Sequence, residues 1–233
     1  MRVGLLLVGH VAPTSTHIAG DYPELFTALL WDSLGELVRY DLDEDRFPES
    51  VTECDGWILS PSRCSVTDAH PWIASAEDLV RELIERERPY VGICFGHQLA
   101  AQAFGAPVRR AGDGWQVGIH EYEVVDPQPW MEPGDRSVAL IASHEDQVMA
   151  VPENATLLLR TEGCPVAGLT FGDRAWTVQP HPEFTVDLAD HLLAQRSELI
   201  GAEKVLAARA TLDRTPDQAV VARWIDRFLT GVI

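Results

Sequence analysis

The 233-residue chain carries 36 acidic and 18 basic side chains, which gives it a formal net charge of −18 at pH 7. A charge of this sign repels nucleic acid phosphates and anionic membrane surfaces, so we expect neither as a partner. The apolar fraction of 46% is ordinary for a globular protein and is enough to build a sizeable core.

A short apolar run, residues 3–8, begins the chain and predicts a strand that is buried on both faces. The run is too short to cross a bilayer, and no small-residue cleavage site follows it. The four cysteines show no Cys-x-x-Cys pair or other metal-ligand spacing. We therefore expect a cytoplasmic protein that has reduced thiols and needs no metal or cofactor.

Short apolar runs alternate with helical periods through residue 105. Asp21 and Pro23 mark the start of the first helix, and Ser75 is placed to cap the second. The expected strands are residues 3–8, 36–42, 57–60 and 90–93, and the expected helices are residues 22–34, 76–88 and 95–105.

This order predicts an α/β fold with a mostly parallel central sheet flanked by helices, in which functional groups collect at the carboxyl ends of the strands. From about residue 108 the pattern changes to strands separated by turns. It predicts an antiparallel extension that returns to the sheet just before His181. The expected strands of the extension are residues 119–125, 137–142, 156–160, 166–170 and 175–179.

The last part of the chain, residues 185–233, is helical in pattern. Apolar spacing predicts one helix from Val186 to Ile200, and residues 215–218 (Thr-Pro-Asp-Gln) have the form of a capping box that opens a final helix. No linker or internal repeat interrupts the chain. We therefore expect a single domain over residues 1–233, with these helices at its C-terminal end.

Cys94 stands between an expected strand and an expected helix, in the pattern Gly-x-Cys-x-Gly. A nucleophile on a sharp strand-to-helix turn needs glycine two residues to either side, because Cβ atoms there would clash. Gly92 and Gly96 meet this need, and the helix N-terminus would favour a reactive thiolate. For this motif alone, a buried structural cysteine is an equally good interpretation.

His181 favours the reactive interpretation. It lies between Pro180 and Pro182 at the end of an expected strand. The two prolines restrict its backbone, which suits a side chain that must hold one orientation. Glu183 can accept a hydrogen bond from Nδ1, so that Nε2 faces a thiol. A cysteine, a histidine and an orienting acid form a complete nucleophilic set, and we expect Cys94, His181 and Glu183 to meet.

Residues 91–99 (Val-Gly-Ile-Cys-Phe-Gly-His-Gln-Leu) and 179–183 (Gln-Pro-His-Pro-Glu) together resemble the two signatures of class I glutamine amidotransferases. The resemblance covers roughly residues 1–190 and implies a flavodoxin-like fold. The motifs are most similar to those of stand-alone members that look like the amidotransferase domain of GMP synthetase, including plant-type γ-glutamyl peptidases. Three further stretches match the family's order: residues 55–60, 115–118 and 143–148.

The resemblance also implies residue roles. Cys94 would attack the γ-carbonyl of glutamine or a γ-glutamyl compound and form a thioester, while His181 would shuttle the proton and Glu183 would orient His181. The backbone N–H groups of Phe95 and Ser62 would form the oxyanion hole. Three residues would contact the small-molecule substrate through side chain or backbone: Gln98, Ser143 and His144.

One departure from the family pattern affects the oxyanion loop. The family usually has Ser-Gly-Gly-Pro or Ser-Gly-Ser-Pro where this chain has Ser-Pro-Ser-Arg at residues 60–63. Pro61 has no N–H, and loss of one oxyanion donor costs about 2.7–4 kcal/mol of transition-state stabilisation. By alignment the donor is Ser62, which keeps its N–H, although Pro61 and Arg63 change the conformations open to the loop.

Two functions from different classes fit these residues. One is an enzyme that cleaves a γ-glutamyl amide, and the other is a non-catalytic or regulatory amidotransferase-like subunit of a synthetase complex, which only Pro61 favours. The chain contains no phosphate-binding Gly-x-x-x-x-Gly-Lys-Ser/Thr loop, so the acceptor of any ammonia is not evident. A separate synthetase subunit would receive it, or the protein would hydrolyse γ-glutamyl compounds alone. We favour the second, because the C-terminal helices would cover a docking surface. The alternative is that these helices are themselves the docking element.

Overall fold

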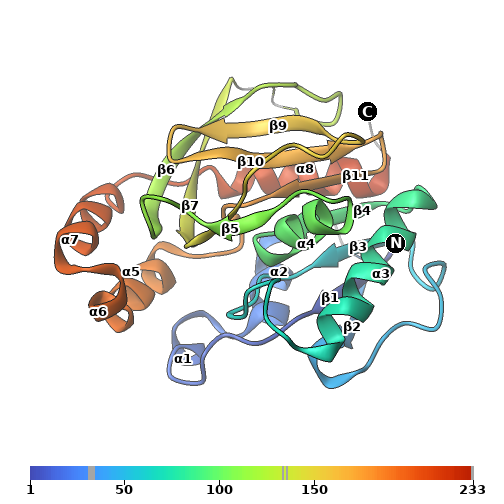
Figure 1. The fold of residues 1–233 in the computed structure, drawn as a ribbon, viewed down its shortest axis with the longest axis horizontal. Helices are drawn as coiled ribbons and strands as arrows, with labels where there is room; N and C mark the ends of the chain where they lie inside the picture. Colours follow the sequence, from blue (N-terminus) through green and yellow to red (C-terminus); the bar gives the residue numbers. More distant parts are fainter. Residues whose placement is uncertain (31–34, 133, 135, 232–233) are drawn as a thin grey trace.

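The computed structural model describes residues 1–30, 35–132, 134 and 136–231. In this part of the chain the strands form a nine-stranded sheet, in the order β2-β1-β3-β4-β11-β10-β9-β6-β7, and a two-stranded sheet of β5 and β8 (Figure 1). The first five strands of the large sheet are parallel and the remaining four are antiparallel, as the sequence pattern predicts.

The parallel strands place their carboxyl ends at one edge of the sheet. β4 lies between β3 and β11, and Ile93 at its end pairs with Val178. Both β3 and β4 are buried throughout, because helices cover both faces of the sheet. The parallel strands are β1 (Arg2–Leu7), β2 (Glu36–Asp41), β3 (Gly56–Leu59), β4 (Tyr90–Ile93) and β11 (Ala175–Val178).

The antiparallel strands extend the sheet beyond β11, and the chain then returns to the edge where the parallel strands end. The N–H of His181 donates to the carbonyl of Ile141 on β7 (2.8 Å), which ties the segment after β11 to the extension. These strands are β6 (Gln116–Val124), β7 (Ser137–His144), β9 (Thr156–Thr161) and β10 (Cys164–Phe171). Sequence analysis missed the small sheet of β5 (Val108–Arg110) and β8 (Asp146–Val148), whose strands have three residues each.

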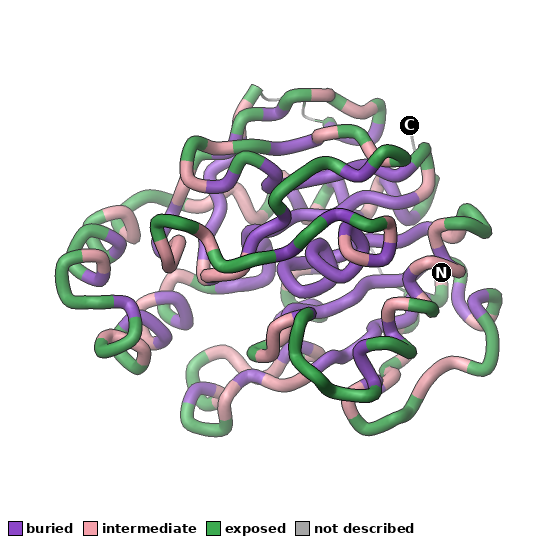
Figure 2. Tube along the Cα trace, in the orientation of Figure 1, coloured by how far each residue is buried: buried purple, intermediate pink, exposed green. Residues whose placement is uncertain are grey.

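Helices pack on both faces of the large sheet and divide the core in two. Alternate strand residues point to opposite faces, so Leu5 belongs to the cluster that contains α2 (Tyr22–Leu29) and α8 (Gln218–Thr230), whereas Leu6 belongs to the other. α3 (Pro71–Glu85) and α4 (Phe95–Ala103) cover that second face. Figure 2 shows the buried residues along the strands and the inner sides of these helices.

The shorter helices lie at the rim. α5, α6 and α7 form a lobe beside β6 and β7 (Figure 1), where Thr211 accepts the N–H of Ile119 (2.8 Å). None of the described helices has the length and apolarity needed to cross a bilayer. The remaining helices are α1 (Thr16–Ala19), η1 (Leu42–Glu44), α5 (Val186–Gln195), α6 (Ser197–Ile200) and α7 (Ala202–Thr211).

Of the two N-caps predicted for the first two helices, one is confirmed and one is wrong. Asp21 caps α2 in a capping box with Glu24, as its position predicts, and residues 31–34 of that predicted helix lie outside the described residues. The cap assigned to Ser75 is wrong, because α3 already begins at Pro71. Proline is preorganised for the first helical position, and Trp72 adds to the buried side of the helix.

Two expectations for the C-terminal helices are also wrong. The predicted single helix from Val186 to Ile200 is two helices that meet at Arg196. The predicted capping box over residues 215–218 does not form, because Asp217 is the residue before α8 and its carboxylate accepts the N–H of Ala139 on β7 (2.7 Å). A tertiary contact thus uses the side chain that the local pattern assigned to the helix end.

Cys94 lies on a sharp turn between β4 and α4, as predicted. Its φ of 51° and ψ of −95° are rare for a residue with a side chain and cost about 1–3 kcal/mol. A Cβ on Gly92 would lie 2.6 Å from the carbonyl oxygen of Gly96, and a Cβ on Gly96 would lie 2.8 Å from that of Leu59. The two glycines therefore allow strand and helix to close around Cys94.

We expect Gly92→Ala to destabilise the protein by about 1–3 kcal/mol, because the added methyl group must displace the backbone of the turn. Thermal denaturation measures this loss. Gly112→Ala is the matched control, since a Cβ there meets nothing within 4 Å. Equal melting temperatures for the two variants would show that close packing at the turn does not require glycine.

Candidate active site

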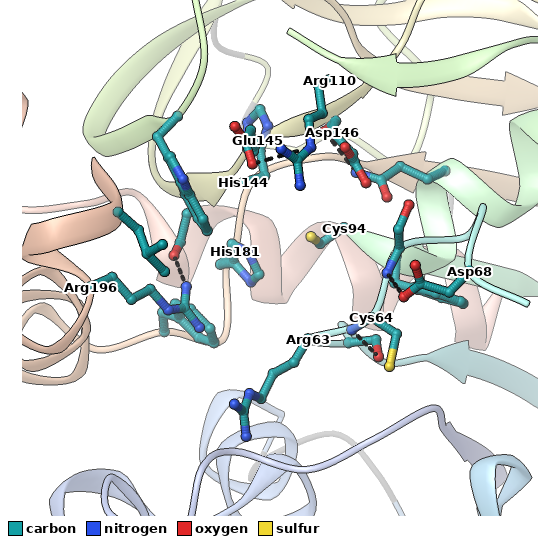
Figure 3. A pocket seen from close by; sticks show the side chains of 18 of the residues that line it. Arg63, Cys64, Asp68, Cys94, Arg110, His144, Glu145, Asp146, His181 and Arg196 are labelled. Carbon is teal, nitrogen blue, oxygen red and sulfur yellow. Dashed lines mark hydrogen bonds and ion pairs between the residues drawn. The ribbon is translucent and has the colours of Figure 1, made fainter. Parts of the chain in front are cut away.

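A cavity of about 370 Å³ opens at the carboxyl edge of the parallel strands (Figure 3). The loop after β3, the start of α4, the end of β7 and the segment after β11 all contribute to its wall. Cys94 and His181 face each other across the cavity, and Arg196 reaches it from the junction of α5 and α6. Seven of the eight residues that the sequence assigns to the site line this cavity, and the eighth, Glu183, lies behind His181.

His181 is held on three sides. Its backbone N–H is bound to Ile141, Nδ1 lies 2.8 Å from Oε1 of Glu183, and the ring stacks on Phe184 with centroids 4.0 Å apart. His181 and Glu183 are 2% and 3% exposed, so the pair is shielded from water. Nε2 of His181 has no hydrogen bond within the described residues and is the ring nitrogen left for chemistry in the cavity.

The charges around His181 favour its protonated form. Burial alone would lower the pKa of the ring, but the nearby charges of Glu183 and Cys94 outweigh burial and raise the pKa to about 10. A protonated imidazole beside a cysteine sulfur stabilises the thiolate and can also supply a proton. The arrangement therefore has the parts of a nucleophile with its acid–base partner.

Two glutamines form a chain of hydrogen bonds to the cysteine. Gln98 Nε2 donates to the carbonyl of Asp146 (2.8 Å) and to Oε1 of Gln179 (3.0 Å). Gln179 Nε2 in turn donates to Sγ of Cys94 (3.5 Å). Because both amide hydrogens of Gln98 are used, only its Oε1 is left to meet a ligand. The role of Gln179 was missed by sequence analysis, since the pairing joins side chains of separate elements.

Serine hydroxyls fix the loop after β3. Ser60 Oγ accepts the N–H of Val8 (3.2 Å), and Ser62 Oγ donates to the carbonyl of Val8 (2.6 Å). The loop is thereby attached to the end of β1 despite Pro61. Within the described residues the backbone N–H of Ser62 has no hydrogen bond, and that of Phe95 lies in the first turn of α4, where helices offer free donors.

Ser143 and His144 end β7 in the cavity wall. Ser143 Oγ accepts a hydrogen bond from Nη1 of Arg196 (3.0 Å). His144 is 4% exposed, and neither ring nitrogen has a hydrogen bond within the described residues. Burial, assisted by the charge of His181, lowers the pKa of His144 to about 3. The His144 ring is therefore neutral and too weakly basic to take up a proton at ordinary pH.

Two further ring-bearing residues of the matching motifs differ in location. Trp115 lines the cavity, where Arg196 lies over its ring, whereas His97 is a core residue whose ring nitrogens contact Thr177 and Val166. One group of three possible metal ligands exists among the described residues, at the cavity rim: Cys64, Asp68 and His70, with ligand atoms within 4.8 Å of one another. Asp68 and His70 are exposed, and Asp68 already accepts the N–H of Ser65.

Comparisons with known proteins identify sequences similar to this chain. The family model described as "Glutamine amidotransferase class-I" matches residues 33–198. Gamma-glutamyl peptidase 3 of Arabidopsis thaliana is 25% identical over 91% of this chain and 90% of its own length. One subunit of the glutamine-hydrolyzing GMP synthase of Halobacterium salinarum is 31% identical over 75% of this chain and 88% of its own length.

A solved structure supports the fold. The crystal structure of a glutamine amidotransferase from Thermotoga maritima superposes with a TM-score of 0.77, covering 98% of this chain and 99% of that one at 19% identity. At this identity the likeness establishes architecture alone, whereas the family model spans more than half of the sequence. The chain therefore belongs to the class I glutamine amidotransferase family.

Proposed function

We propose that the protein is a cytoplasmic, single-domain hydrolase that cleaves the γ-amide of glutamine or of a γ-glutamyl compound through a thioester on Cys94. The observation that carries this proposal is the position of Cys94 on a strained turn, facing a histidine that Glu183 holds by a 2.8 Å hydrogen bond. Strain kept at a reactive residue is typical of a functional site.

Each step of the reaction has a group in place. The Cys94 sulfur attacks the γ-carbonyl carbon, and the oxyanion that forms accepts hydrogen bonds from the N–H groups of Phe95 and Ser62. His181 then donates its proton to the leaving nitrogen, and the C–N bond breaks to leave the γ-glutamyl thioester. Water, deprotonated by His181, attacks the thioester and releases glutamate and the free thiol.

The two glutamines fit different parts of this scheme. Gln98 Oε1, whose amide nitrogen is already bonded, would accept from the ammonium group of the glutamyl moiety, which the backbone near Ser143 and His144 would also contact. Gln179 would hold the thiolate in position through its hydrogen bond to Cys94. Because the N–H of Ser62 is free of other described partners despite Pro61, the loop also supports an enzyme rather than a non-catalytic module.

The C-terminal helices support a hydrolase that acts alone. α8 packs into the core through Trp224 and Phe228, so it covers the sheet rather than offering an apolar face to a partner. The family includes named γ-glutamyl peptidases at low identity. The second candidate is the glutaminase component of a synthetase, which the exposed Leu199 (75%) and Leu206 (73%) favour, since they offer an apolar contact on the lobe.

Steady-state assays test the assignment of the nucleophile. Cys94→Ala should abolish hydrolysis of glutamine and γ-glutamyl dipeptides, because the variant lacks the sulfur that forms the thioester. Glu183→Gln should leave a residual rate, since it weakens the orientation and charge of His181 but keeps a side chain of the same shape. Cys54→Ala, a buried cysteine outside the cavity, should retain activity. Full activity in Cys94→Ala would reject the mechanism.

Selective alkylation tests the state of the thiol. Iodoacetamide at neutral pH should modify Cys94 faster than Cys54, Cys64 or Cys164, and a glutamine-like diazo-ketone should protect it. Burial raises the pKa of Cys164 to about 12 and also raises that of Cys54, so neither thiol should compete. Mass-spectrometric mapping gives the rate at each site, and equal rates at all four would count against an activated nucleophile.

The same assays separate the two candidates. Turnover of γ-glutamyl dipeptides by the isolated protein supports the stand-alone hydrolase. If the isolated protein hydrolyses neither glutamine nor dipeptides, and addition of a synthetase restores glutamine hydrolysis, the protein is the glutaminase component of that synthetase. Self-sufficiency is then rejected.

A further inference from the structure

Arg196 is a half-buried cation whose charge has no carboxylate partner among the described residues. Its Nη1 donates to the hydroxyl of Ser143 (3.0 Å), and its guanidinium lies 5.6 Å from the ring centre of Trp115. It forms no ion pair with any carboxylate that the structure describes, and burial lowers its pKa. Withdrawing a charge from water without an opposite charge is costly, so such a group is a candidate for binding an anionic ligand.

Arg63 adds a second cation to the same end of the cavity. It lies on the loop after β3 and lines the cavity with Arg196. Across the described residues it has neither an ion pair nor a side-chain hydrogen bond, and its charge further lowers the pKa of Arg196. The two guanidinium groups therefore repel each other, and neither is paired with a carboxylate that the structure describes.

At the opposite end of the cavity, the arginine has carboxylates beside it. Arg110 pairs with Glu145 (3.6 Å), and Asp146 lies beside them. In Figure 3 these three residues lie above Cys94, whereas Arg63 lies below it and Arg196 to one side. The uncompensated positive charge is thus confined to one side of the reactive sulfur.

A bound γ-glutamyl compound would extend to both sides of Cys94. In the proposed function the glutamyl moiety lies towards Gln98, whose amide is bonded to the carbonyl of Asp146. The leaving amine would then extend towards Arg63 and Arg196, and Arg196 is bonded to the side chain of Ser143 rather than to its backbone. Glutamine releases ammonia, which has no carboxylate to meet them, but an amino acid or peptide leaving group carries one.

We propose that Arg63 and Arg196 form a carboxylate-binding subsite that recognises the leaving group, so that the enzyme prefers γ-glutamyl amino acids and peptides to glutamine. This inference rests on the proposed hydrolysis at Cys94. A chain of net charge −18 repels anionic substrates unless positive charge is concentrated at the cavity. The two arginines would supply that positive charge. Arginine suits the task, since its planar fork matches a carboxylate.

Three substrates isolate the leaving-group carboxylate: γ-glutamylglycine, its C-terminal amide and glutamine. Arg196→Gln should lower kcat/KM for γ-glutamylglycine on the order of tenfold or more, mainly through KM, as expected for a lost charge-assisted hydrogen bond. It should change the values for the amide and for glutamine much less, and Arg196→Lys should restore part of the preference. Arg63→Gln should act in the same direction, and because this residue is exposed the variant tests the subsite without disturbing the core.

Arg110→Gln is the matched control, because it removes a cavity arginine that already has a carboxylate partner. It should leave the ratio of kcat/KM for γ-glutamylglycine to that for its amide unchanged. If Arg196→Gln and Arg63→Gln lower kcat/KM for all three substrates equally, the arginines act on the glutamyl moiety or on the fold. That result would reject the subsite.

A binding measurement keeps the subsite testable if the proposed hydrolysis fails. Calorimetry on the Cys94→Ala protein compares γ-glutamylglycine with its amide without any turnover. Affinity for the free acid should be higher by about tenfold, and Arg196→Gln in the same background should remove the difference. Equal affinity for acid and amide, or no binding of either, would overturn the subsite whatever the activity of the native protein.

Discussion

The close approach of a helix to two parallel strands at residue 94 is the constraint on which the rest of the site depends. Gly96 packs against the carbonyl of Leu59 and Gly92 against that of Gly96, so any side chain at either glycine would separate the helix from the sheet. The strain at Cys94 is sustained because strands on both sides fix the turn. The same strand neighbourhood brings His181 to the sulfur, since β11 lies directly beside β4.

Sequence analysis predicted the parts of the fold and site that depend on local pattern. The glycines around Cys94 predict the turn, and the prolines around His181 predict a ring with a fixed orientation, because each constraint acts within a few residues. Apart from the approach of His181 to Cys94, which the paired motifs indicated, contacts between distant segments were not predictable. Gln179 reaches Cys94 only through strand pairing, and Asp217 bonds to β7 instead of capping its own helix. The role of each side chain depends on a tertiary neighbour that no local pattern specifies.

The charge of the cavity differs from one region to another. The buried Glu183 and the sulfur of Cys94 keep His181 protonated, while burial keeps His144 neutral a short distance away. Beyond this centre, Arg63 and Arg196 keep an uncompensated positive charge on a strongly acidic protein. Family membership establishes the scaffold, but the substrate is selected by such charges around the nucleophile. The break between α5 and α6 matters for this reason, because it places Arg196 at the cavity.

Trapping the covalent γ-glutamyl thioester on Cys94 would provide the strongest test of the proposed mechanism. The protein is mixed with a γ-glutamyl dipeptide, quenched with acid during turnover, digested and examined by mass spectrometry. If Cys94 is the nucleophile, one γ-glutamyl group should appear on the peptide that contains Cys94. This group should disappear on treatment with hydroxylamine and be absent from the Cys94→Ala protein. Turnover without any adduct on Cys94, or an adduct on another residue, would contradict the mechanism.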